Sequence, residues 1–180
     1  MRIFSVGIVA SVLLLAGCQS DLPPTAAQST PAVSNEFGPR SMEIHPVFTQ
    51  IKDWTGDGKP DGIEVSLEFD DQFHDPTKAA GRVVFELYSF RQTSPDPRGN
   101  RLANPWIGSL MTIADQEAHW SRTSRTYTFE LAYPKISIDR TYVLTATFDQ
   151  EGGGRFFDRI VLKGRKAHLN KARARGNSHL

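Results

Sequence analysis

Cysteine is almost absent from this sequence, because its 180 residues include a single one, Cys18. A disulfide needs two cysteines, so the chain forms no internal disulfide, and its folded part must be stabilised by packing or by a bound metal. Long apolar runs are also scarce. The longest, from Val6 to Ala16, has about eleven residues, well short of the roughly 20 that a membrane-spanning helix requires.

Motifs of the common enzyme classes are missing as well. There is no His-x-His or His-Glu-x-x-His spacing, no Gly-x-Ser-x-Gly elbow, no Ser-x-x-Lys pair and no phosphate-binding glycine loop. His74-Asp75, close behind Asp70 and Asp71, has the residue types of a metal-assisted hydrolase. A solvated acidic loop explains the same residues more simply, so catalysis ranks third among the functions considered.

The N-terminus has the plan of an export signal, with Arg2 ahead of the apolar run and small residues behind it. The run ends in Leu15-Ala16-Gly17-Cys18, which resembles the lipobox of bacterial lipoproteins. The resemblance implies cleavage before Cys18, so that residues 1–17 are a signal peptide, and acylation of the Cys18 sulfur and the new amino terminus. The alternative is an ordinary secretory signal that a cysteine follows by chance, which leaves an exported free thiol without a purpose.

Acylation predicts a place in the cell envelope, with the chain anchored in the outer membrane or on the exported face of the cell membrane. Gln19 follows the cysteine at a position where lipoproteins retained in the inner membrane often carry Asp, which favours the outer membrane. Each buried CH₂ group contributes about 0.8 kcal/mol, so two or more acyl chains hold a protein firmly. The membrane is therefore the first expected partner.

Composition divides the rest of the chain into three parts. Residues 18–40 hold several prolines among small polar residues, which is typical of a disordered tether. Residues 41–164 have the pattern of a folded domain. Residues 165–180 form a basic tail with little apolar surface, expected to be disordered. The tail either attaches to anionic lipid or glycan or simply solubilises the chain, and a nucleic-acid partner is not expected for an anchored, exported protein.

Apolar and polar residues alternate along several segments of the middle part. The clearest runs from Ile63 to Phe69, and others cover 83–90, 126–131, 142–148 and 156–162. This period of two predicts strands with one buried face. Because no segment has a sustained helical stripe, the expected fold is all-β: a single antiparallel β-sandwich, Ig-like or C2-like, of six or seven strands.

Three further segments have weaker patterns. Met42 to Ile51 is expected to be one strand with Pro46 at an edge or a bulge. A strand is also expected over Ile107 to Ile113, and a short helical turn over Ala114 to Arg122.

The segment from Asp53 to Glu64 has the ligand spacing of a calcium loop. Counted from Asp53, oxygen-bearing side chains stand at positions 1, 3, 5, 9 and 12, a glycine stands at position 6, and the backbone carbonyl at position 7 is available. The stretch resembles EF-hand loops and, more closely, the calcium loops of FG-GAP and dockerin-type repeats. That resemblance implies a structural Ca²⁺ held by Asp53, Thr55, Asp57, Asp61, Glu64 and the carbonyl of Lys59.

The surroundings depart from those families. Pro60 replaces the usual aliphatic residue, the flanks alternate like strands rather than helices, and the loop occurs once instead of in several copies. An empty hairpin loop rich in glycine and aspartate is therefore the alternative.

Three tryptophans in or beside loops, Trp54, Trp106 and Trp120, suggest a second binding activity. Indole rings at such places stack on sugars in β-sandwich carbohydrate-binding modules, but they equally serve as plugs for the ends of a core. The sequence thus predicts an envelope-anchored, non-catalytic binding or structural module stabilised by calcium, with a glycan or an envelope protein as its ligand. A carbohydrate-binding accessory module is the first alternative, and a metal-assisted hydrolase is the second.

Overall fold

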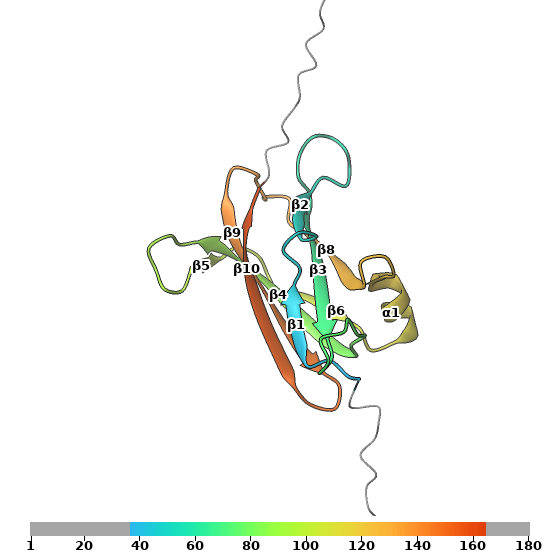
Figure 1. Cartoon of the computed structure of the whole chain (residues 1–180). Coiled ribbons are helices and arrows are strands. Elements are labelled where there is room, and N and C mark those ends of the chain that lie inside the picture. Colours follow the sequence, from blue (N-terminus) through green and yellow to red (C-terminus); the bar gives the residue numbers. More distant parts are fainter. Residues whose placement is uncertain (1–36, 165–180) are drawn as a thin grey trace, which may run out of the picture. The chain divides into compact units, whose positions relative to one another are not determined.

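The computed structural model describes residues 37–164, which form two antiparallel five-stranded sheets packed face to face (Figure 1). This architecture confirms the predicted all-β sandwich, although residues 37–164 form ten strands rather than the six or seven expected, because short strands without a readable period join the longer ones. The lipobox, residues 18–36 of the tether and the basic tail lie outside the described residues.

The first sheet, called sheet A, is built around the nine-residue strand β3. β1 and β2 pair with one edge of β3, β8 pairs with its other edge, and β7 continues beyond β8. Its strands are β1 (Ser41–Ile44), β2 (Gln50–Lys52), β3 (Gly62–Asp70), β7 (Trp120–Ser121) and β8 (Thr126–Ala132).

The second sheet, sheet B, has the order β10-β9-β4-β5. β6 also pairs with β4, next to the residues that pair with β5. A short helix, α1 (Ile113–His119), follows β6 and leads into β7 of sheet A. The strands of sheet B are β4 (Gly81–Phe90), β5 (Arg98–Arg101), β6 (Trp106–Ser109), β9 (Thr141–Gln150) and β10 (Arg155–Lys163).

The core lies between the sheets and consists of the side chains that alternate inward. Phe69 of β3 meets Phe148 of β9 with ring centroids 4.7 Å apart, and Phe129 of β8 meets Phe85 of β4 at 5.1 Å. Each pair joins one sheet to the other. These aromatic contacts, together with the buried aliphatic residues around them, supply the stability that a protein without disulfides must obtain from packing.

Two weak sequence patterns fold differently from the prediction. Instead of one strand over Met42–Ile51, the chain makes a turn at residues 46–48 that separates β1 from β2, because proline lacks the N–H that a continuous ladder needs. The strand expected over Ile107–Ile113 ends at Ser109. The helix α1 then begins at Ile113, inside the expected strand.

β1 and β10 lie side by side at the open edge of the sandwich, although they do not form a ladder with each other (Figure 1). The carboxylate of Asp158 on β10 accepts a hydrogen bond of 2.7 Å from the backbone N–H of Ile44 on β1. A side chain thus pairs a backbone group at this edge that would otherwise be left unpaired.

Candidate functional site

The predicted calcium loop is the connection of the β2–β3 hairpin. The backbone N–H of Asp61 donates to the carbonyl of Lys52 at 2.8 Å and closes the base of the loop. Gly56 and Gly58 have φ of 73° and 86°, a backbone region that glycine enters without steric cost. These two glycines let the chain reverse within a few residues.

The loop carboxylates accept hydrogen bonds from the loop's own backbone. Asp53 accepts from the N–H groups of Gly56 at 2.6 Å and Gly58 at 2.8 Å. Asp61 accepts from the N–H groups of Trp54 at 2.8 Å and Thr55 at 2.9 Å. The bond from the Thr55 backbone, with help from that of Trp54, lowers the pKa of Asp61 below its usual value.

Of the remaining predicted ligands, Asp57 lies in the loop and Glu64 does not. Asp57 accepts from the N–H of Lys59 at 2.8 Å, so it stays in the loop. Glu64 lies on β3, where its carboxylate is 3.5 Å from Lys52 Nζ. The structure thus gathers Asp53, Thr55, Asp57, Lys59 and Asp61 in one loop, while Glu64 contacts the neighbouring strand. Within residues 37–164, no three His, Cys, Asp or Glu side chains are grouped as a set of metal ligands.

Trp54 packs onto the start of β3. A Cβ atom on Gly62 would lie 2.8 Å from two carbons of the Trp54 ring and 2.2 Å from the carbonyl oxygen of Leu131, so only glycine fits there. The Trp54 Nε1 atom is buried and has no hydrogen-bond partner in the described part of the chain. Trp54 therefore holds the loop against the sheet, and its ring is not displayed as a binding surface.

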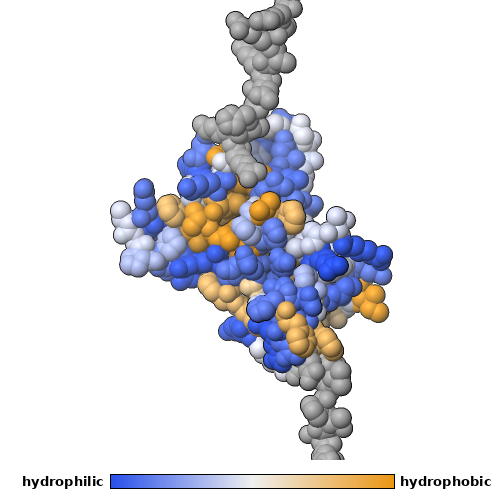
Figure 2. Space-filling model, in the orientation of Figure 1, coloured by the Kyte–Doolittle hydropathy of each residue, from blue (hydrophilic) through white to orange (hydrophobic). Residues whose placement is uncertain are grey.

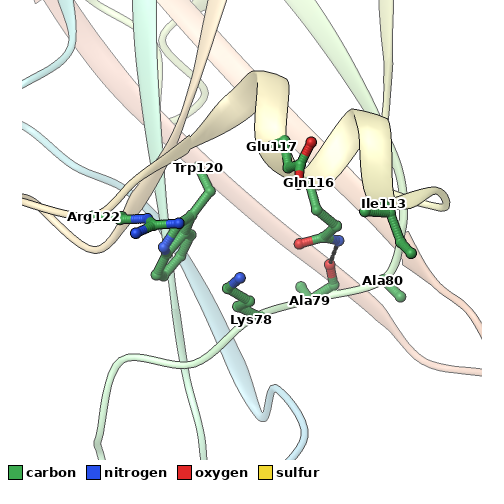
Figure 3. A pocket seen from close by; sticks show the side chains of 8 residues that line it. All are labelled: Lys78, Ala79, Ala80, Ile113, Gln116, Glu117, Trp120 and Arg122. Atoms are coloured by element: carbon green, nitrogen blue, oxygen red, sulfur yellow. Dashed lines mark hydrogen bonds between the residues drawn. The ribbon is translucent and has the colours of Figure 1, made fainter.

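A cleft of about 790 Å³ lies between α1 and residues 78–80 (Figure 3). In Figure 3, Trp120 and Arg122 stand at one end of the cleft and Ile113 at the other, with Lys78 reaching toward the indole. The Lys78 Nζ atom is 5.3 Å from the centre of the Trp120 ring, a cation–π distance. The lining therefore combines an aromatic face with two cations.

The floor of the cleft is held by Gln116 of α1. Its Nε2 donates to the carbonyls of Ala79 at 2.8 Å and Leu110 at 2.7 Å, and its Oε1 accepts from the Tyr127 hydroxyl. Burial raises the pKa of Tyr127, although its bonds to Ala79 and Gln116 oppose that effect. The helix is thus fixed to residues 78–80, so the cleft is preformed.

The local sequence explains why a helix forms at this place. Thr112 accepts a hydrogen bond from the N–H of Asp115 at 3.1 Å, and Asp115 accepts one from the N–H of Thr112, which is a capping box. The hydroxyl of Ser109 also donates to Asp115 at 2.7 Å and is the main cause of its lowered pKa. Thr112-x-x-Asp115 is the sequence signal that identifies the start of α1.

Trp106 lies on the other side of α1, beside a smaller cavity of about 270 Å³. His119 and Phe129 line this cavity as well, with their rings stacked 4.2 Å apart. Both Trp106 and Trp120 are partly buried against the core, and Trp120 also meets the edge of Tyr127 at 4.9 Å. The three tryptophans predicted to stack on sugars therefore do not form one platform, and only Trp120 lines the larger cleft.

The acidic stretch near His74 forms a tight turn after β3. Asp71 is buried, and its Oδ1 accepts from the N–H groups of Phe73 at 2.8 Å and Asp75 at 3.1 Å. His74 has φ of 65°, and its N–H closes the turn by donating to the carbonyl of Asp71 at 3.2 Å. The aspartate that the sequence offered to a hydrolytic site thus organises its own backbone.

Among residues 37–164 the one helix, α1, has seven residues, and no helix there is long and apolar enough to cross a bilayer. Comparisons with models of protein families, with curated proteins and with solved structures gave no match to this chain.

Proposed function

We propose that the chain is a lipid-anchored protein of the cell envelope whose β-sandwich is a non-catalytic binding module. The anchor is argued from Leu15-Ala16-Gly17-Cys18 and the short apolar run before it. The observation that carries the binding role is the preformed cleft beside Trp120. Its volume falls in the range of small-ligand pockets, and its aromatic and charged lining is suited to polar ligands.

The anchor is tested by growing cells with a palmitate analogue that carries an alkyne and by determining the mass of the N-terminal peptide. We expect label on the chain and a mature N-terminus at an acylated Cys18. The variant Cys18→Ala should lose the label. A labelled Cys18→Ala chain, or a mature N-terminus elsewhere, would contradict the anchor.

A glycan is the ligand class that the cleft favours. Indole rings bind sugar C–H faces, and Lys78, Arg122 and Glu117 offer hydrogen-bonding groups to hydroxyls or acidic substituents at the rim. The cleft has one ring rather than a platform, so we expect it to take one or two sugar units. Titration of tryptophan fluorescence across a panel of neutral and acidic oligosaccharides is the direct test.

The matched variants are Trp120→Leu and Trp106→Leu, because both rings are partly buried but only Trp120 lines the larger cleft. Binding should be lost in Trp120→Leu and retained in Trp106→Leu. A flat response of the unsubstituted protein to every oligosaccharide would remove the glycan proposal and leave an envelope protein as the ligand to be sought.

Calcium is proposed as a structural ion of the loop between β2 and β3. Support comes from the oxygen atoms that Asp53, Thr55, Asp57, Lys59 and Asp61 bring into one loop. The N–H groups that already stabilise these carboxylates lessen the need for a cation. We therefore expect a weak site, with Kd in the range of about 10⁻⁴ to 10⁻³ M that extracellular modules show.

Thermal melting in chelator and in millimolar calcium measures this binding. An ion that binds only the folded state raises stability by RT ln(1 + [L]/Kd). Asp57→Ala should abolish the rise, because Asp57 has the fewest bonds to the loop backbone, whereas Glu151→Ala in the β9–β10 turn should keep it. Equal melting temperatures in chelator and calcium would exclude the ion.

A further inference from the structure

The outer face of sheet B has rows of charged side chains that alternate with rows of apolar ones. Residues that pair across antiparallel strands point to the same side of the sheet, so the register defines each row. One row holds Arg155, Asp149 and Arg82, and the next holds Phe157, Thr147, Val84 and Ile107. The following row holds Arg159, Thr145 and Glu86. We call this surface the arginine face.

Two apolar side chains of the arginine face are strongly exposed. Phe157 of β10 is 54% exposed and Ile107 of β6 is 75% exposed. Single exposed apolar residues are common on soluble proteins, but these two belong to one row and lie between two rows that carry arginine. Apolar surface also gathers near β9 and β10, as Figure 2 shows in orange.

The net charge of this face is positive because its cations outnumber its acids. Arg155 contacts Asp149, Arg101 contacts Glu86 at 3.2 Å, and Arg98 and Arg159 both contact Asp96. No ion pair in residues 37–164 involves Arg82 or Lys163, which are exposed on the same face. Arg82 lies across from Asp149, which Arg155 already contacts, so the arginine face as a whole carries an excess of cations.

The outer face of sheet A has the opposite character. Glu43 stands directly across from Glu68, and Glu64 across from Glu130. Like charges in such cross-strand positions are unfavourable, and the ion pair of Lys52 with Glu64 relieves them only in part. The sandwich thus carries mostly acids on the outer face of sheet A and mostly arginines on the outer face of sheet B. This separation of charge orients the arginine face toward an anionic surface.

We propose that the arginine face docks on the anionic phospholipid surface of the membrane that holds the lipid anchor. This inference rests on the proposed anchor, which keeps the domain within a tether's length of that surface. Cations near an anionic leaflet contribute about 1 kcal/mol each, and exposed aromatic and aliphatic side chains enter the headgroup region. A hydrated polyanion, or sheet A of a second copy, would attract the arginines but offer no apolar medium to Phe157 and Ile107.

The single cysteine of the chain allows a direct test in the full chain with Cys18→Ser, which cannot be acylated. A fluorophore sensitive to polarity is placed on Phe157→Cys, and in a matched chain on Phe73→Cys, which is 59% exposed in the turn after β3. Vesicles of phosphatidylglycerol and phosphatidylcholine are added, then vesicles of phosphatidylcholine alone. We expect a blue shift at position 157 with the anionic vesicles and none at position 73.

Charge variants give a second readout by vesicle co-sedimentation. The triple variant Arg82→Gln, Arg155→Gln and Lys163→Gln should bind the anionic vesicles about tenfold more weakly or worse. The control removes equal charge elsewhere, through Arg40→Gln, Arg125→Gln and Lys135→Gln, and should bind as the parent chain does. The export signal and basic tail are the same in all chains, and melting temperatures confirm that each variant folds.

Three outcomes would overturn the proposal. The first is equal loss of binding in the two triple variants, and the second is a blue shift at position 73 as large as that at 157. The third is association of the chain with itself without vesicles, abolished by the triple variant of the arginine face, which would assign that face to a second copy. Since no chain here is acylated, failure leaves the anchor itself untouched.

Discussion

Tyr127 of β8 donates a hydrogen bond to Gln116 of α1, and both residues also bond to Ala79. One hydroxyl and one amide thus connect sheet A, the helix and the segment that leads into sheet B. Because Gln116 and Ala79 also line the cleft beside Trp120, the stability of the domain and the shape of its candidate site depend on the same hydrogen bonds.

Removing the Tyr127 hydroxyl, a single oxygen atom, should clearly lower the free energy of unfolding. Tyr127→Phe leaves Gln116 Oε1 and the N–H of Ala79 without this partner, and unpaired buried polar groups cost about 1–3 kcal/mol. Urea unfolding at neutral pH measures the loss. Tyr133→Phe is the control, since no hydrogen bond of its hydroxyl occurs in the described residues. Equal losses in the two variants would refute a special role of Tyr127.

Two glycines in and beside the loop from Asp53 to Asp61 should respond differently to alanine. At Gly62 an added Cβ meets the backbone of Leu131 and the ring of Trp54, and such overpacking costs about 1–3 kcal/mol or more. At Gly56 the space is open, and the penalty comes only from its φ of 73°, about 1 kcal/mol. Melting temperatures compare the two variants. A greater loss of stability in Gly56→Ala than in Gly62→Ala would contradict the close packing around Gly62.

The contribution of the α1 capping box to the free energy of unfolding should be measurable separately. Thr112→Ala removes the acceptor for the N–H of Asp115 and should lower the free energy of unfolding by about 1 kcal/mol. Thr123→Ala, in the exposed turn after β7, should change it little. Chemical denaturation compares the two variants. If they unfold at the same denaturant concentration, the cap does not contribute to stability.

Asp96 should make stability depend on acid pH. Hydrogen bonds from the Arg98 side chain, with a smaller effect of Arg159, lower the pKa of Asp96 from 3.8 to about 2. The unfolded chain therefore binds the proton at a higher pH than the folded one, so the stabilisation is complete above about pH 4 and is lost as the pH falls toward 2. Asp96→Asn should flatten the dependence of stability on pH in that window, which urea unfolding at a series of pH values between about 2 and 4 measures. The contact is exposed to solvent, so the change in slope is small.

The longer strands follow from the sequence because alternation over seven or more residues leaves one face to bury. From Ile63 to Phe69 and from Tyr142 to Phe148, every second side chain enters the core. The short strands β2, β5 and β7 have two to four residues and carry no readable period. Each short strand is positioned by its hydrogen bonds to a neighbouring strand. This pairing depends on the tertiary fold and not on the local sequence.

The two candidate sites also differ in how far the local sequence predicts them. The loop from Asp53 to Asp61 is local, so its spacing and its glycines could be predicted, whereas Glu64 is directed by the strand period to the sheet surface and away from the loop. The cleft beside Trp120 joins α1 to residues 78–80, far apart in the chain, and Gln116 carries no motif. Such a site emerges only when the sheets are assembled.

The contact between Asp158 and Ile44 joins the last strand of the domain to the first, across 114 positions of sequence. Contacts between such distant residues form late in folding, because the entropy of closing a long loop must be met first. The sandwich therefore cannot close its open edge until β10 has been synthesised. A nascent chain stopped anywhere before Arg155 lacks this strand altogether, so the final folding step waits for synthesis of Arg155–Lys163.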